Sequence, residues 1–468
     1  MTIFRRFFDV TRMKPALVRG DLPASRQVYK NTFGVAWPAI LEAVLVASVG
    51  IIDTMMVGTI SDSAIAAVGV TNQPRMIALS LFFAMNVGVT VVVARRKGED
   101  NQKEANRVLR QSVLLQLYLS VVVAIFTGIS FFSRPLLAFA GAGPEILGDA
   151  SVYFNIVMAT LPVNALTMCI NAAQRGCGNT RISLVTNVTA NAVNIVFNYL
   201  LINGIWFFPK LGVAGAAYAT VLGNVVALCI CLYSVFRPNG FLWLRIKGSL
   251  ALHFASLKSV LSVSSSALAE QFFVRAGFFF YAKIVFDLGP LHSVTHTIAM
   301  QLASFSFCFG DGLSVAASSL VGQNMGRDRP DIALAHGKAC QRIGFAFGLL
   351  LFCSFAMLRG VWFIPFSDNP EVAALGAHLV LILAFICPAQ ISQVILCGAL
   401  RGAGDTRFVA LLSLVCIGLL RPLLAYALCY PAGWGLIGAW TAFLVDQYLR
   451  LSLSLSRFSS GKWMAIKL

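Results

Sequence analysis

Twelve mostly apolar stretches follow one another along the chain, separated by short polar segments. Each is long enough to cross a bilayer as a helix, which takes roughly 20 residues. The span at 66–94 contains Pro74 and Arg75, so we expect it to bend or to begin outside the lipid. The expected spans are 33–58, 66–94, 112–132, 150–172, 183–205, 211–236, 257–286, 293–322, 340–358, 373–398, 408–429 and 434–456.

Basic residues in the connecting segments orient these spans. With the N-terminus in the cytoplasm, the segments on the other side hold only Arg134, Lys210 and Arg359, and the cytoplasmic segments are rich in Lys and Arg. Such a bias sets the orientation of helical membrane proteins. We therefore predict a multi-pass protein of the bacterial cytoplasmic (inner) membrane, with both termini cytoplasmic.

Two short phrases recur along the chain. The first, RGCGNTR at 175–181, returns as RGAGDTR at 401–407, and the second, GEDNQKEA at 98–105, returns as GRDRPDIA at 326–333. Both phrases return after nearly the same distance along the chain, which indicates a duplicated half. Both RG-x-G-x-T-R loops fall on the cytoplasmic side, so the halves are parallel repeats of six helices. Each loop is either a glycine helix cap with basic anchors or a hinge.

The repeat predicts the division of the chain into two lobes around a central cavity. A cytoplasmic linker joins the lobes, and a cytoplasmic tail lies at each end. The expected boundaries are 1–32 for the N-terminal tail, 33–236 for the N-lobe with helices one to six, 237–256 for the linker, 257–456 for the C-lobe with helices seven to twelve, and 457–468 for the C-terminal tail.

Composition agrees with an all-α integral membrane protein. Hydrophobic residues make up 58% of the chain and charged residues 12%, too few to cover a soluble protein of 468 residues. The net charge of +17 follows from the cytoplasmic loops, so no nucleic-acid partner is expected. The expected partners are a small-molecule substrate and the lipid bilayer, and the chain is expected to be a monomer.

The sequence holds no motif of an enzyme or a nucleotide-driven pump. The phrases GxxxxGK[ST], HExxH and GxSxG do not occur. We therefore expect no catalytic residue, no nucleotide, no metal site and no cofactor. An internal repeat in so apolar a chain is typical of a transporter built from two related bundles. Energy for uphill transport would then come from an ion gradient, with H⁺ or Na⁺ as the coupling ion.

Acids inside the expected spans need a specific reason, since a charge in hydrocarbon is costly. Glu42 and Asp53 lie eleven residues apart, which puts them within about 20° of one helix face and about 16 Å apart. Both can face one cavity at different depths. Pro38 should bend the same helix. Asp53 is thus a candidate for ion exchange and Glu42 a cavity candidate, the alternative for each being a packing hydrogen bond.

Asparagines line the fifth span in the same half. Asn191, Asn194 and Asn198 follow a spacing of three and four, which places them on one helix face. Amide oxygens beside a carboxylate suit a small hard cation. Such stripes also join membrane helices without any further role, and this alternative stays open.

The second half offers other candidates. Glu270 is poorly placed to pair with Arg275 on its own helix, so it should face a cavity or another helix. Asp311 lies between glycines in FGDGLS. Arg421, before Pro422, has no obvious local partner and should either neutralise an acid or contact an anionic group. Asp446, near the cytoplasmic end, is expected to form a solvated pair with Arg450.

Four phrases resemble the multidrug and toxic compound extrusion (MATE) family over nearly all of 33–456. They are P-x14-DTMMVG at 38–58, GVAGAAYAT at 212–220, LVGQNMG at 320–326 and GALRGAGDTR at 398–407. The resemblance implies twelve helices in two lobes around a cavity. It also implies efflux of amphiphilic, often cationic, compounds in exchange for inward H⁺ or Na⁺.

The resemblance also implies roles for individual residues. Asp53 matches the family's N-lobe carboxylate, Pro38 its helix bend, and Asn194 and Thr220 polar partners of that carboxylate. Asn198 stands where many members have a second Asp, which should weaken cation binding or limit the site to one proton.

In the C-lobe, Glu270 matches a carboxylate that some members use to bind a cation, and Gln390 stands where those members have an Asp. We therefore place coupling in the N-lobe. The predicted function is secondary active antiport. The alternatives are a flippase of lipid-linked saccharide or an exporter of a polar metabolite. A channel or a receptor without transport activity is an alternative of a different class.

Overall fold

The computed structural model consists of helices joined by turns and short irregular segments in the part of the chain it describes. It describes residues 8–13, 15–58, 60–128, 130–205, 208–237, 240–244, 252–366 and 369–466, and none of these forms a strand. Parts of the predicted tails and linker, including Pro238, Asn239, Arg245 and Lys247, lie outside the described residues. The predicted all-α fold is confirmed.

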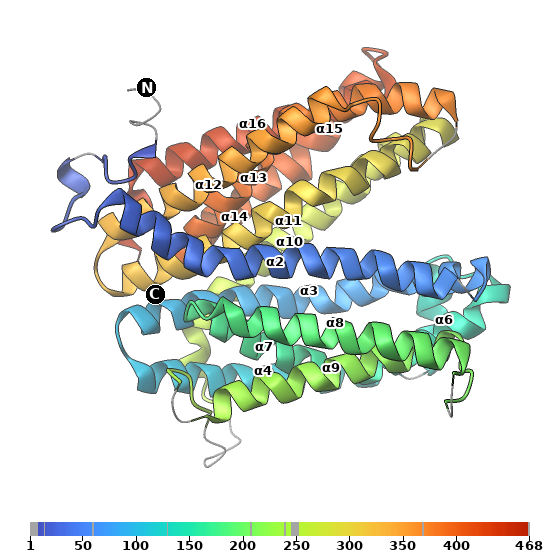
Figure 1. Cartoon of the computed structure of the whole chain (residues 1–468), viewed down its shortest axis with the longest axis horizontal. Coiled ribbons are helices and arrows are strands. Elements are labelled where there is room, and N and C mark those ends of the chain that lie inside the picture. The colour runs from blue at the N-terminus through green and yellow to red at the C-terminus, as the bar shows by residue number, and fades with distance from the viewer. Residues whose placement is uncertain are drawn as a thin grey trace. The chain divides into compact units, whose positions relative to one another are not determined.

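In the first half of the chain, helices cover all six expected spans (Figure 1). The fourth expected span is two helices, α6 and α7, that meet at an angle of 49°. A short helix, α5 (Ser130–Phe139), is additional. The others are α2 (Ser25–Gly58), α3 (Asp62–Gly98), α4 (Gln102–Gly128), α6 (Pro144–Ala159), α7 (Leu161–Gly176), α8 (Thr180–Asn203) and α9 (Val213–Phe236).

In the second half, the eleventh expected span contains a π-helical segment, η2 (Leu414–Leu420), between α14 (Thr406–Ser413) and α15 (Arg421–Cys429). Two 3-10 turns, η1 (Pro15–Leu17) and η3 (Lys462–Ala465), lie near the termini. The remaining helices are α10 (Phe254–Phe286), α11 (Pro290–Gly326), α12 (Pro330–Met357), α13 (Pro370–Ala403) and α16 (Gly435–Ser460).

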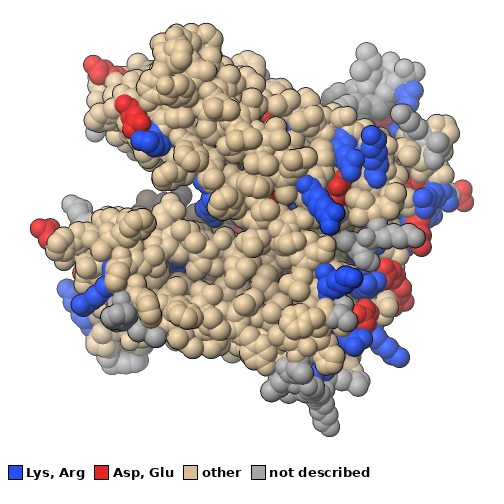
Figure 2. Space-filling view, turned by 180° about the vertical axis from the view of Figure 1, so that it is seen from behind, with Lys and Arg blue, Asp and Glu red and all other residues tan. Residues whose placement is uncertain are grey.

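Not every expected span passes a test of apolarity. Within the described residues, nine helices are long and apolar enough to cross a membrane, or ten if α6 and α7 form one span. The remaining two expected spans are α10 and α16, which carry Glu270 and Asp446. On the face shown in Figure 2, the sides of the helices are mostly uncharged, and Lys and Arg gather toward the helix ends.

The sequence repeat is also a repeat of backbone conformation. Among the described residues other than glycine, those with positive φ are Asp100, at 53°, and Asp328, at 54°. These two residues hold the same place in the second repeated phrase. Gly178 and Gly404, which correspond in the first phrase, have φ of 82° and 94°. Glycine adopts this conformation without the penalty of a side chain. The second glycine of each RG-x-G-x-T-R loop therefore ends its helix, as the capping interpretation predicts.

The first glycine of each loop has a different role. A Cβ on Gly176 would lie 2.6 Å from the carbonyl oxygen of Thr90, and one on Gly402 would lie 2.2 Å from that of Ser318. Thr90 and Ser318 also correspond to each other, at the offset of the second repeated phrase. These glycines therefore let α7 approach α3, and α13 approach α11, more closely than any other residue would allow.

We expect Gly402→Ala to destabilise the protein by about 1–3 kcal/mol, because the new methyl group overlaps the backbone of α11. The matched control is Gly34→Ala in α2, where nothing lies within 4 Å of the added Cβ. That change should be neutral or stabilise by up to ~1 kcal/mol, since alanine favours helix. Thermal unfolding in detergent measures both, and equal melting temperatures for the two variants would contradict the packing role.

Packing divides the chain into two units. The N-unit is 41–264, and the C-unit is 1–40 together with 265–468. The division falls inside α2 and inside α10, so each of these helices belongs partly to each unit. The helix α2 continues through Pro38, and the division comes between Ile40 and Leu41. The packed units thus differ from the halves of the repeat at the first helix of each half.

Close contacts explain this assignment. A Cβ on Gly312 of α11 would lie 2.6 Å from Cα of Ile40, so the start of α2 packs tightly within the C-unit. Likewise, a Cβ on Gly88 of α3 would lie 2.6 Å from the carbonyl oxygen of Val260 in α10. The hydroxyl of Ser264 also donates to the carbonyl oxygen of Met85, at 3.4 Å.

Candidate functional site

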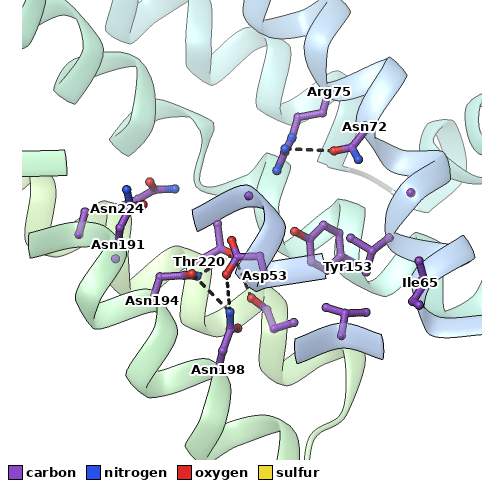
Figure 3. Close-up of a pocket in the computed structure, with 17 residues that line it drawn as sticks. Asp53, Ile65, Asn72, Arg75, Tyr153, Asn191, Asn194, Asn198, Thr220 and Asn224 are labelled. Carbon is purple, nitrogen blue, oxygen red and sulfur yellow. Dashed lines mark hydrogen bonds between the residues drawn. The ribbon is translucent and has the colours of Figure 1, made fainter. Parts of the chain in front are cut away.

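Asp53 lines a cavity of about 380 Å³ within the N-unit. The walls come from α2, α3, α6, α8 and α9 (Figure 3). The polar residues that line it are Asp53, Asn72, Arg75, Tyr153, Asn191, Asn194, Asn198, Thr220 and Asn224. The structure therefore brings together the four residues predicted for coupling: Asp53, Asn194, Asn198 and Thr220.

The four residues form a connected hydrogen-bond chain. Nδ2 of Asn198 donates to Oδ1 of Asp53 at 2.9 Å and lies 3.3 Å from Oδ1 of Asn194. Nδ2 of Asn194 donates to the hydroxyl of Thr220 at 3.3 Å. Rotating the Asn194 amide by half a turn would instead place its nitrogen 2.7 Å from Oδ1 of Asp53. In that orientation both amides donate to the carboxylate, as suits its charged form.

Helical spacing brings these side chains to one place. Asn191, Asn194 and Asn198 share a face of α8, and Thr220 comes from the neighbouring α9. Asn194 and Asn198 are buried, and Oδ1 of Asn198 has no hydrogen-bond partner among the described residues. One carboxylate and several amide oxygens around a small space form a set of groups that suits either a proton or a hard cation.

Arg75 is the residue of this cavity whose role the sequence reasoning missed. Its guanidinium donates to Oδ1 of Asn72 at 3.1 Å and interacts electrostatically with Asp53 (Figure 3). The available signal was a positive charge inside an apolar span, which is rare unless it faces a cavity. The cavity therefore carries one charge of each sign, a feature that neither the spacing nor the family resemblance indicated.

Glu42 is not among the residues that line this cavity. Its carboxylate accepts from Nδ2 of Asn187 at 2.6 Å and from Arg175, whose NH1 is 3.3 Å away. Arg175 is the first residue of RGCGNTR, in the last turn of α7. Glu42 thus connects α2 to α7 and α8, which corresponds to the packing alternative.

The C-unit repeats this ion pair. The carboxylate of Glu270 accepts from NH2 of Arg401 at 2.9 Å and from its Nε at 3.3 Å. Arg401 is the counterpart of Arg175 in the first repeated phrase, and Glu270 follows Glu42 at the offset of the second. In both halves the first arginine of the loop therefore contacts an acid on the first helix of that half.

Gln390 and Asp311, the other candidates considered for a C-lobe cation site, have interactions of their own. Gln390 is buried in α13, and its Oε1 accepts from the hydroxyl of Ser306 at 3.0 Å. Asp311 is exposed on α11 and interacts electrostatically with Arg401. The guanidinium of Arg401 thus lies where a cation bound by Glu270 would lie.

Arg421 neutralises an acid distant in the sequence, which is one of the two roles predicted for it. It donates through Nε to Oδ2 of Asp446 at 3.1 Å, and NH2 of Arg450 lies 3.3 Å from the same oxygen. The predicted pair of Asp446 with Arg450 is therefore present, but the expectation that it is solvated is wrong, because Asp446 is fully buried. The Arg421 guanidinium lies over the ring of Phe443, 4.4 Å from its centroid. This buried cluster joins α15 to α16.

Long helices in two packed units, with a half-buried carboxylate in a cavity of one unit, are typical of a secondary transporter. The MatE family model matches residues 38–200 and 267–427, which is more than half of the chain. The chain belongs to the MATE family of membrane transporters.

Individual relatives agree with this assignment. The chain is 28% identical over 457 residues to a probable multidrug resistance protein, NorM, of Thermotoga maritima, covering 96% of this chain and 97% of that protein. It is 26% identical over 440 residues to the uncharacterized transporter YisQ of Bacillus subtilis, covering 93% and 95%. It shares its fold with an outward-facing multidrug resistance MATE family transporter of the MOP superfamily, at a TM-score of 0.85, 19% identity and coverage of 96% and 99%.

Proposed function

We propose that this protein is an antiporter that exports small amphiphilic, often cationic, organic compounds in exchange for inward H⁺ or Na⁺. The observation that carries the proposal is the cavity in which Asp53 receives a hydrogen bond from Asn198 beside Asn194 and Thr220. The relatives named multidrug resistance proteins support export as the direction.

The coupling step that we propose is neutralisation of Asp53. Burial in a membrane protein disfavours the charged carboxylate, so entry of a cation from outside is favourable there. The ion, either a proton or Na⁺ held by amide oxygens, removes the negative charge on which a cationic substrate depends. A change in α2, whose backbone lacks one hydrogen bond at Pro38, then accompanies expulsion of substrate.

Counterflow of a cationic dye in inverted vesicles tests this function. H⁺ and Na⁺ gradients are imposed separately, with empty vesicles as the control. Uptake that depends on one gradient supports antiport and identifies the ion. Leak that is independent of both gradients indicates a channel, and no uptake of the dye under either gradient contradicts the proposal.

The C-lobe should contribute less to coupling. Glu270 already has Arg401 as its counter-charge, and Gln390 supplies no second acid. We expect Glu270→Gln to lower transport or change the range of substrates while ion-driven exchange persists. The same vesicle assay checks this, and loss of coupling in Glu270→Gln with coupling retained in Asp53→Asn would reverse the assignment of the lobes.

Arg75 should select among substrates. A guanidinium on the cavity wall can bind an acidic group of a zwitterionic compound while Asp53 binds its amine. We expect Arg75→Gln to weaken transport of zwitterions about tenfold relative to monocations, the worth of roughly one charged hydrogen bond. The control is Lys103→Gln, an exposed charge outside the cavity. An unchanged ratio of the two rates would exclude this role.

The alternative, a flippase for lipid-linked saccharide, has less support. Such a protein needs several cations for a pyrophosphate, and the C-unit candidates are Arg275, Lys283 and Arg421. Arg421 is buried against Asp446, and Lys283 pairs with Asp287 at 3.4 Å. Export of small organic compounds therefore remains our proposal.

A further inference from the structure

A second cavity of the N-unit, of about 620 Å³, lies at the ends of α3, α7 and α9 and the start of α8. We call it the basic pocket. We propose that it binds the phosphate headgroup of an anionic phospholipid, from the leaflet that the basic loops predict to be cytoplasmic. The residues used in the argument are Lys97, Asn179, Arg181, Tyr233, Arg237 and Phe241.

Positive charge converges on this pocket. Lys97, Arg181 and Arg237 line it, and no acidic residue is among its described lining residues. Two of the charges lie over aromatic rings: Lys97 is 3.8 Å from the centroid of Phe241, and Arg237 is 4.6 Å from that of Tyr233. An aromatic face attracts a cation but carries no net charge, so the pocket keeps its positive potential.

The repeat shows how the other half neutralises the corresponding loop. Asp405 of RGAGDTR accepts from Nε of Arg457 at 2.8 Å. The corresponding residue of RGCGNTR is Asn179, whose amide donates to Oε1 of Gln174 at 3.4 Å. The half with the basic pocket thus has a neutral side chain where its copy has an acid.

The wall of the pocket is fastened in place. Nε2 of Gln102 donates to the carbonyl oxygen of Phe241 at 3.0 Å, and the backbone N–H of Trp243 donates to Oδ1 of Asn106 at 2.7 Å. These bonds hold residues 240–244 against α4. The ring of Phe241 is therefore fixed beside Lys97.

Apolar surface continues from the pocket and favours a lipid over a soluble anion. Val185 and Tyr233 line the pocket and are 53% and 60% exposed. Both lie on helices that are apolar enough to span the membrane. A phospholipid whose phosphate is bound by the three cations would thus place its acyl chains against α8 and α9. Basic pockets between helix ends on the cytoplasmic side are typical sites for anionic headgroups.

The test measures lipid binding to the purified full-length protein in detergent by native mass spectrometry. The ligands are phosphatidylglycerol, phosphatidylcholine and soluble glycerol 3-phosphate. The pocket variant is Lys97→Gln with Arg237→Gln. The control variant is Lys103→Gln with Lys258→Gln, two exposed charges of the same unit outside the pocket. A melting curve without lipid establishes that both variants are folded.

We expect the wild type and the control variant to bind phosphatidylglycerol more tightly than phosphatidylcholine. The pocket variant should bind phosphatidylglycerol roughly 30-fold more weakly, the combined effect of two basic residues. Equal affinity of the pocket and control variants would overturn the proposal. So would binding of glycerol 3-phosphate as tight as that of the lipid, which would assign the pocket to a soluble anion. The assay needs no transport, so its outcome is independent of the proposed function.

Discussion

Asp53→Asn should abolish transport of substrate against its gradient while the protein still folds and reaches the membrane. Asparagine has nearly the shape of aspartate, and its amide oxygen can still accept from Asn198, which lies 2.9 Å from the carboxylate. The variant carries the neutral state permanently, so an incoming ion has no charge to neutralise. Loss of a charge within a membrane helix also lowers the cost of inserting it.

Vesicle uptake of a cationic dye under an imposed H⁺ or Na⁺ gradient measures this effect. We expect gradient-driven accumulation to fall to the level of vesicles without the protein. The matched control is Asp287→Asn, which removes the same charge from an exposed pair with Lys283 and should transport normally. Efflux at the wild-type rate by Asp53→Asn, at equal expression, would falsify the coupling scheme.

Asp446→Asn should cause the largest loss of stability. Asp446 is fully buried and is the shared counter-charge of Arg421 and Arg450, which are 1% and 6% exposed. Removing the acid leaves two guanidinium groups facing each other without a negative partner. Breaking a buried ion pair in this way costs about 3–5 kcal/mol. By contrast, Asp287→Asn breaks an exposed pair, worth roughly 0–1 kcal/mol.

Thermal unfolding in detergent, followed by size-exclusion chromatography, compares the two variants. We expect Asp446→Asn to give little folded protein at temperatures where Asp287→Asn and the wild type remain intact. A milder variant, Arg421→Met, leaves Asp446 paired with Arg450 and keeps the comparison possible if Asp446→Asn does not accumulate. Equal stability of Asp446→Asn and Asp287→Asn would show that the cluster adds nothing.

Apolar runs were sufficient to predict where the spanning helices lie, because a span needs roughly 20 apolar residues whatever the tertiary packing. They did not predict the helix lengths, since α3 and α11 each have 37 residues and extend beyond the predicted spans. The bend between α6 and α7 could not be predicted. Pro162 lies in the first turn of α7, directly after the bend, whereas Pro388, its counterpart in the second half, lies within the unbroken α13. Whether a proline breaks a helix depends on its neighbours, and a Cβ on Gly348 would lie 2.7 Å from Cα of Pro388.

The candidate site was predictable to the extent that it depends on helical spacing and on family resemblance. Asp53, Asn194, Asn198 and Thr220 are gathered as expected. The ion pairs of Glu42 and Glu270 were not predicted, because each joins residues far apart in the sequence, at separations of 133 and 131. The two acids do share the offset of the repeat, so comparing the halves residue by residue would have indicated both pairs.

The sharing of α2 and α10 between units has a consequence for the origin of the chain. Consider an ancestor in which a single half formed a homodimer before the duplication. In that dimer, the segment equivalent to residues 25–40 of each subunit would have packed on the other subunit, as in domain swapping. Fusion would then have made both exchanges intramolecular. Cutting the present chain within 237–256 should accordingly yield two fragments that each lack a packed arm and that fold only when expressed together.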